Sequence, residues 1–228
     1  MDPTHPILAG LRRPERYATG PDVLRELRRV IVSGQVVPGT FVPVDDVAAF
    51  FQVSRIPVRE ALKTLIGEGL VAHEQRGGYT VTLLSAEELS ELYVVRGALE
   101  AAATAAAVRN ARAADDRRAR EAHDTLGAAI ADGDAAAYQR HSRGFHEALL
   151  SSCGMPRLLH MLEVAWNLTE PMQPMTLLEP GQLSELHAEH QQMLDAFLAR
   201  DADRLAQLSA QHQGHLTTYV EGATQPGA

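Results

Sequence analysis

Two arginines four residues apart, Arg55 and Arg59, have the residue type and spacing for reading a nucleic acid. Residues at this spacing share one face of a helix, and a guanidinium group can bind guanine through two hydrogen bonds or hold a phosphate. Ser54, just before them, could donate to a phosphate at a helix N-terminus, where backbone amides favour anions. Arg76 and Gly77 stand at the tip of a predicted hairpin, from which the arginine could enter a minor groove. The alternative is an arginine pair on a solvated helix face.

The elements that must position these side chains follow the order helix, helix, turn, helix, hairpin. Helical periodicity, an N-cap at Ser54 and glycines that permit a tight hairpin predict them. The three helices and two strands are expected at residues 21–34, 44–51, from Ser54 to a break at Gly69, 70–73 and 79–82.

This order predicts a winged helix-turn-helix domain over residues 21–84. Residues 1–20 hold three prolines and two glycines and show no periodic apolar pattern, so we expect a flexible N-terminal arm there.

The chain beyond residue 84 is predicted to be all helical. Ser85 and Glu88 form a capping box that opens an alanine-rich helix of about six turns. Further helices are expected near residues 112–131, 134–152, 155–169, 181–199 and 202–221. The predicted fold class is therefore mostly α, with a winged N-terminal domain and a helical bundle over residues 85–228.

Charge is distributed unevenly along the 228 residues. The net charge of −8 argues against nucleic-acid binding, but residues 1–84 carry ten Arg and Lys against nine Asp and Glu, which permits a local basic patch.

Cys153 is the single cysteine and cannot form an intramolecular disulfide, and no run of about 18 apolar residues suggests a membrane span. The first residues also lack the pattern of a secretory signal. We expect a soluble, cytoplasmic protein.

The first third of the chain resembles the GntR family of bacterial transcription regulators. The resemblance covers about 60 residues and is carried by GQVVPG at 34–39, VSRIPVREAL at 53–62 and EGLV at 68–71. It implies that Ser54, Arg55 and Arg59 contact DNA from the recognition helix and that Arg76 and Gly77 form the wing tip. The sequence departs from some relatives in the second helix, where Asp45 and Asp46 should oppose phosphate.

The helical part, entered by LYVVRGALE at 92–100, resembles the FadR-type effector domain, or FCD domain, of the same family. Relatives often hold a divalent metal ion in the bundle, and the resemblance assigns His146, His190 and His212 as ligands. The position four residues before His146 is acidic or Asn in relatives, but here it is Ser142. Three imidazoles plus water still suit zinc or another late first-row ion, with a carboxylate effector able to replace the water.

Two residues of the first body helix are candidate effector contacts. The family's R-x-x-x-E pattern implies that Arg96 lies near the effector pocket, with Tyr93 on the same stripe. The alternative is an ion pair between Arg96 and Glu100 one turn along the helix. The histidines of this part could likewise be ordinary core residues, and loss of the acidic ligand could mean a pocket without metal.

These observations favour a non-enzymatic, ligand-responsive regulator that binds a pseudo-palindromic operator as a homodimer. One short recognition helix reads too few base pairs for useful specificity, which favours two copies. The effector is expected to be an organic acid. Two alternatives are a metal-dependent hydrolase that uses the three histidines with a bound water, and a constitutive DNA-binding protein whose body only dimerises.

Overall fold

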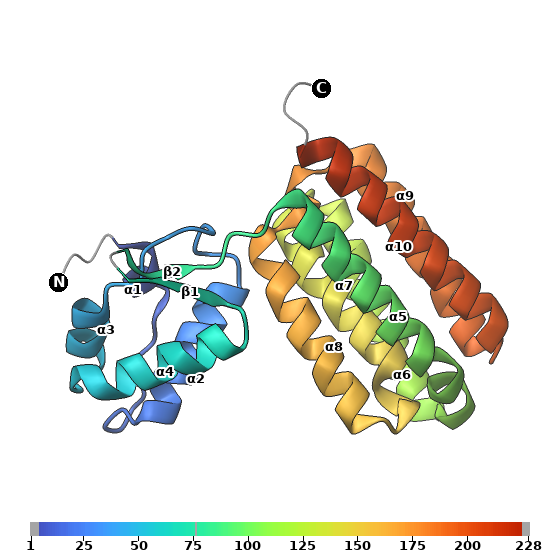
Figure 1. The fold of residues 1–228 in the computed structure, drawn as a ribbon. Coiled ribbons are helices and arrows are strands. Elements are labelled where there is room, and N and C mark those ends of the chain that lie inside the picture. Colours follow the sequence, from blue (N-terminus) through green and yellow to red (C-terminus); the bar gives the residue numbers. More distant parts are fainter. Residues whose placement is uncertain (1–4, 76, 225–228) are drawn as a thin grey trace. The chain divides into compact units, whose positions relative to one another are not determined.

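The computed structural model describes residues 5–75 and 77–224 and divides into two compact units (Figure 1). The first unit comprises Met1–Ser85 together with Asn167–Met172, and the second comprises Ala86–Trp166 together with Gln173–Ala228. The predicted fold class, a winged helix-turn-helix followed by an all-helical bundle, is confirmed.

The first unit contains the predicted helices and hairpin in the predicted order. Its elements are α1 (Pro6–Gly10), α2 (Gly20–Val32), α3 (Val44–Phe51), α4 (Arg55–Gly67), β1 (Val71–Glu74) and β2 (Gly78–Val81). Gly69, with φ of +76°, follows the end of α4 in the left-handed conformation that glycine adopts at little cost. The strands pair antiparallel from Val71 opposite Val81 to Glu74 opposite Gly78.

Residues 5–19 belong to the segment expected to be a flexible arm, and in this described part the chain forms a short helix and buries apolar side chains. Residues Pro6–Gly10 form α1, and its Ile7 is fully buried in the core of the first unit. The backbone also lies close to α2, because a Cβ on Gly10 would come within 2.9 Å of Val30 Cγ1. Proline and glycine content suggested mobility, but the apolar side chains of this segment have a core to enter.

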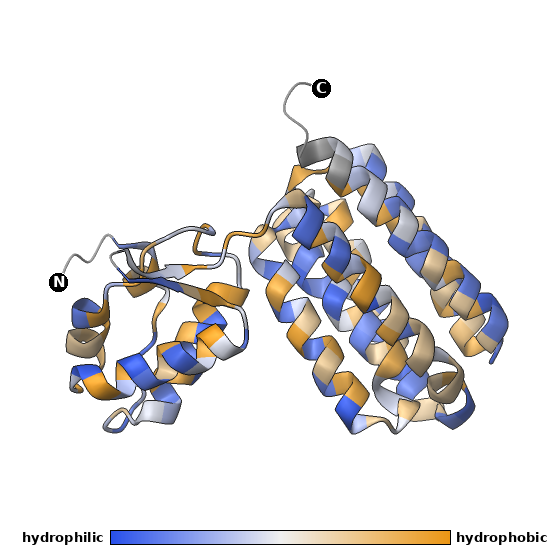
Figure 2. Ribbon diagram, viewed as in Figure 1, coloured by the Kyte–Doolittle hydropathy of each residue, from blue (hydrophilic) through white to orange (hydrophobic). Residues whose placement is uncertain are grey.

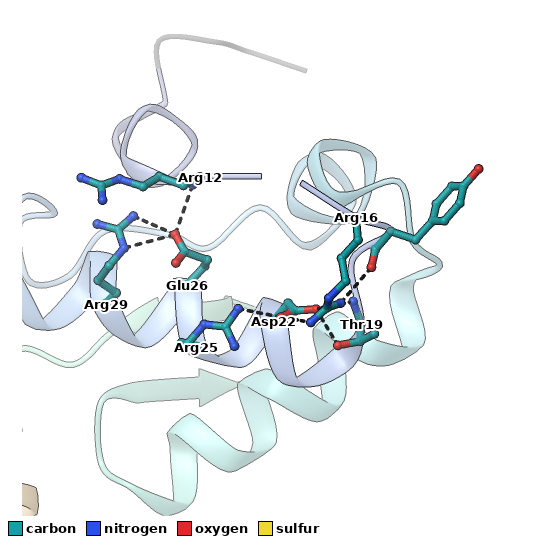
Figure 3. Close-up of polar contacts among 8 residues, drawn as sticks. Arg12, Arg16, Thr19, Asp22, Arg25, Glu26 and Arg29 are labelled. Carbon is teal, nitrogen blue, oxygen red and sulfur yellow. Dashed lines mark hydrogen bonds and ion pairs between the residues drawn. The ribbon is translucent and has the colours of Figure 1, made fainter. Parts of the chain in front are cut away.

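Two acidic residues of α2 bind the segment that precedes the helix (Figure 3). The carboxylate of Asp22 accepts two hydrogen bonds from Arg16, at 2.7 and 3.0 Å, and one from the Thr19 hydroxyl at 2.6 Å. Glu26 accepts one from the backbone amide of Arg12 at 3.2 Å. These contacts hold residues 12–19 against α2.

The second unit is a bundle of long helices. They are α5 (Ala86–Asn110), α6 (Ala113–Ala131), α7 (Ala135–Leu150), α8 (Pro156–Thr169), α9 (Pro180–Leu198) and α10 (Ala202–Thr224), with short 3-10 turns η1 (Ser151–Cys153) and η3 (Pro174–Leu177). The last three residues of α8 and the 3-10 turn η2 (Glu170–Met172) are assigned to the first unit. Hydrophilic and hydrophobic residues alternate along these helices, as expected where one face is buried (Figure 2). None of the described helices is both long and apolar enough to cross a membrane.

Candidate functional sites

The recognition helix α4 exposes the residues that the sequence singled out. Its apolar face, with Val58 and Leu62 fully buried, packs into the core of the first unit. Ser54, Arg55 and Arg59 are exposed. Because the core fixes one face of the helix, the opposite face is accessible to a duplex.

Arg55 is paired with an acidic residue of α3. Its Nη2 donates to Asp45 Oδ2 at 3.0 Å, and its Nε forms a second, shorter contact with Asp45 Oδ1. The two side chains are 64% and 66% exposed, so the pair contributes little to stability but restricts the orientation of the guanidinium. Sequence reasoning expected Asp45 to oppose phosphate and did not foresee this pairing.

A surface groove of about 680 Å³ lies beside this pair and reaches the hairpin. Its lining includes Phe41, Asp46, Arg59, His73 and Tyr79. Gly77, a predicted wing residue, lies exposed in the turn of the hairpin, and the next residue, Gly78, has φ of +80°, a left-handed conformation that glycine adopts at little cost. Arg76, the other predicted wing residue, lies outside the described residues.

Three histidines from three helices converge inside the second unit. His146 of α7, His190 of α9 and His212 of α10 are all buried. His190 Nε2 lies 3.2 Å from His146 Nε2 and 3.1 Å from His212 Nε2. Three imidazole nitrogens this close to one another need a shared proton or a cation between them, because each presents a lone pair when unprotonated.

The outer nitrogen of each imidazole has an oxygen partner from a different residue. His190 Nδ1 is hydrogen-bonded to the Tyr138 hydroxyl at 3.0 Å, and His212 Nδ1 is 2.8 Å from Glu189. The third, His146 Nδ1, lies 3.4 Å from an oxygen of Glu100. Partners of this kind fix the ring orientation. The carboxylates of Glu189 and Glu100 favour a proton on Nδ1 of His212 and His146, which leaves the Nε2 atoms of these two rings free to bind a metal ion. The Tyr138 hydroxyl can accept a hydrogen bond from His190 Nδ1 in the same way.

Electrostatics also favour the neutral forms of His190 and His212. Burial, reinforced by the neighbouring His212 and His146, holds the pKa of His190 well below its usual value. Burial likewise lowers the pKa of His212, although Glu189 partly opposes the shift. Burial of Glu100 opposes ionisation, yet the neighbouring His146 and Arg96 keep the pKa of that carboxyl below its usual value. Neutral donors of this type suit a late first-row divalent ion.

Ser142, at the position of the missing acidic ligand, is buried one turn before His146 on α7. A neutral hydroxyl is a weak donor, so the three imidazoles are the strong donors of this centre. Two further histidines, each three residues from one of the ligands along the chain, have other contacts. His215 Nδ1 is hydrogen-bonded to Glu189, and the His187 ring stacks on His123 with ring centroids 4.6 Å apart.

The candidate effector residues Tyr93 and Arg96 are both buried on α5. The Arg96 guanidinium lies 5.1 Å from the centre of the Tyr93 ring, and its Nη2 is 3.8 Å from Glu100 Oε1. The ion pair within the helix is therefore present. Through Glu100, Arg96 is also linked to His146, which places the candidate effector residues beside the histidine centre.

Sequence reasoning missed the roles of Tyr138, Glu100 and Glu189. Tyr138 precedes His146 by eight residues, a spacing that keeps two residues near one helix face, so a weak signal existed. The sequence position of Glu189 gives no such signal. Glu189 is adjacent to His190 in the sequence, but its carboxylate contacts His212 and His215 of the next helix. Such contacts between helices carry no signal in the spacing.

Two protein-family models match this chain. Residues 20–81 match the family described as bacterial regulatory proteins, gntR family, and residues 91–215 match the FCD domain. The fold and these matches define a DNA-binding, ligand-responsive transcription regulator. The chain belongs to the GntR family, and its helical unit is an FCD domain.

Several relatives cover most of this chain. The gluconate operon transcriptional repressor of Bacillus licheniformis is 31% identical over 79% of this chain and 73% of its own length. The transcriptional repressor GlaR of Escherichia coli is 29% identical over 85% of this chain and 92% of its own. These relatives are regulators and not enzymes, so the hydrolase alternative is not supported.

The structure of a transcriptional regulator from Rhodococcus is also similar, with a TM-score of 0.77 and 27% identity. The similarity covers 90% of this chain and 99% of the Rhodococcus chain. The structure of Escherichia coli McbR, at 24% identity and a TM-score of 0.80, shows the same fold over 92% of this chain and all of its own.

Proposed function

We propose that this regulator reads a pseudo-palindromic operator as a homodimer and responds to an organic acid bound beside a divalent metal ion. In this proposal residues 21–84 bind DNA, and residues 85–228 bind the effector and dimerise. The convergence of His146, His190 and His212, each oriented through its outer nitrogen, is the observation that carries the metal-dependent part. Because a regulator of bacterial genes acts at the chromosome, we also propose that this protein acts in the cytoplasm.

The DNA-binding part of the proposal assigns base and phosphate contacts to α4 and the hairpin. Arg55 and Arg59 read the major groove, Ser54 donates to a phosphate, and Arg76 with Gly77 forms the wing that approaches the minor groove. Exposure of the α4 residues supports this assignment. Because each half of the operator receives one α4, a second copy of the chain is needed for useful specificity.

Arg59→Ala tests the recognition helix. A duplex is first selected from a randomised library by the wild-type protein and then used in fluorescence anisotropy. Arg59→Ala removes one bidentate contact to a base, so we expect its affinity for the selected duplex to be about tenfold weaker or more. Arg120→Ala, at an exposed arginine of α6, is the matched control and should leave the affinity unchanged. Equal affinities of wild type and Arg59→Ala would refute the assignment.

The effector part of the proposal uses the histidine centre and the stripe on α5. His146, His190 and His212 would hold the ion, which when bound supplies a Lewis-acidic position for a carboxylate oxygen. Arg96, beside the centre through Glu100, contributes positive charge toward the anionic effector, and the Tyr93 ring packs against its guanidinium.

Elemental analysis and calorimetry test the effector part. Wild-type protein is expected to retain close to one equivalent of zinc or another late first-row ion, and His190→Ala should retain none. His160→Ala is the matched control because His160 is 74% exposed on α8. A panel of mono- and dicarboxylic acids should bind the metal-loaded protein and not the chelator-treated protein. A metal-free wild type after incubation with Zn²⁺ would overturn this part and leave the DNA-binding part standing.

A further inference from the structure

A cavity of about 160 Å³ lies between α6, α7 and α9, at the end of the bundle where α7 begins. Its walls are mainly apolar and include Ile130, Leu178 and Leu183. The ring of Tyr138, which is fully buried, also lines it. Gly133 and Ser184, both exposed, lie where the cavity meets the surface. The cavity therefore joins an apolar interior to solvent.

The polar side chains that line the cavity are all engaged. Asp134 Oδ1 accepts a hydrogen bond from the backbone amide of Ala137 at 2.8 Å and so caps α7. Ser184 donates to the backbone oxygen of Pro180 at 2.9 Å, and the Tyr138 hydroxyl is bonded to His190. An ordered water needs two to four polar partners, and this interior offers few. An apolar ligand group suits it better.

The volume indicates how large that group can be. An apolar cavity of about 150 Å³ engineered into another protein stays dry and binds benzene, so a cavity of this size accepts one six-membered ring. The opening toward Gly133 and Ser184 allows a short polar substituent on the ring to remain in water.

The cavity is separate from the histidine centre. Tyr138 stands between the two, with its ring on the cavity and its hydroxyl on His190 Nδ1. The opposite nitrogen, Nε2, is the one that faces His146 and His212. A ligand in the cavity would thus contact a residue that orients His190 without reaching the position of a metal ion.

We propose that this cavity is a binding site for a small aromatic ring, either free or as part of a larger ligand. The proposal depends on neither the metal nor the DNA assignment, so its failure would be distinguishable from theirs.

Benzyl alcohol is a suitable probe because it has one ring and one short polar substituent. Its affinity is expected to be millimolar, as for other fragments of about eight heavy atoms. At ten times the dissociation constant, binding to the folded state should raise the Tm by about 3–5 °C. Glycerol at the same concentration is the control for a general solvent effect.

Two matched variants locate the binding. Ala135 lines the cavity, whereas Ala136 does not, and both are half-buried in the first turn of α7. Ala135→Phe should fill the cavity with a ring of its own and abolish the Tm response, whereas Ala136→Phe should retain it. An equal response of both variants, or none in the wild type, would overturn the proposal.

A measurement on the unmodified protein keeps the test decisive even if Ala135→Phe does not fold. Nuclear Overhauser effects should connect the ring protons of benzyl alcohol with the methyl groups of Ile130, Leu178 and Leu183. Effects restricted to methyl groups elsewhere would also overturn it.

Discussion

Replacing Tyr138 by phenylalanine removes one hydroxyl and keeps the ring that fills the surrounding core. The residue is fully buried, and its oxygen lies 3.0 Å from His190 Nδ1. Burial raises the pKa of Tyr138 far above its usual value, so the hydroxyl is protonated at neutral pH. The substitution therefore leaves a buried imidazole nitrogen without its partner.

Two magnitudes follow from this geometry. An unsatisfied buried polar group costs about 1–3 kcal/mol of unfolding free energy. For about 2 kcal/mol, the Tm of a chain of this size should fall by about 4–8 °C. Loss of a partner that orients a metal ligand weakens metal binding by about 10- to 100-fold, which is about 1.4–2.7 kcal/mol.

The assay compares Tyr138→Phe with Tyr219→Phe. Tyr219, half-buried on α10, donates to Glu185, so its variant also loses a hydroxyl bonded to another side chain, but that side chain is none of the three histidines. Thermal melting of the chelator-treated proteins measures the fall in Tm. Competition titration with Zn²⁺ measures the loss of metal affinity. Unchanged zinc affinity in Tyr138→Phe would refute the orienting role, and an unchanged Tm would refute the buried hydrogen bond.

Three further outcomes are expected. Ile7→Ala should lower the unfolding free energy measured in urea by about 2–5 kcal/mol, whereas a mobile N-terminal segment would give no change. Hydrogen bonds from Thr19 and two arginines hold the pKa of Asp22 well below its usual value. The ionised Asp22 carboxylate therefore stabilises the fold at pH values above the usual aspartate pKa, and this stabilisation is lost as the pH falls toward the lowered pKa. The stability difference between wild type and Asp22→Asn should thus be constant above about pH 5 and shrink below about pH 4; a difference that grows in acid would contradict it. Asp45→Ala should free Arg55 and lower the ratio of affinities for the selected and a scrambled duplex by about tenfold, and an unchanged ratio would show that the pair does not orient Arg55.

The expectation of a flexible arm at residues 1–20 rests on composition, which does not register the burial of Ile7, Leu8 and Leu11. Proline and glycine restrict or loosen the backbone locally, but they say nothing about whether a neighbouring groove accepts an apolar side chain. Ile7 is buried because α2 and the rest of the first unit provide that groove, and Asp22 then binds Arg16 across six residues. Neither contact has a fixed spacing that a sequence pattern could register.

The order of elements in the first unit and the exposed arginines of α4 were predictable from periodicity, capping and turn residues, because these are local properties of the backbone. The three histidines were also predictable, through their resemblance to a known pattern. Their oxygen partners were not: Tyr138, Glu100 and Glu189 reach the centre from three different helices. The same holds for the pairing of Asp45 with Arg55 and for the ring-sized cavity. These features depend on how separate helices pack, and packing brings together side chains whose separation along the chain has no period.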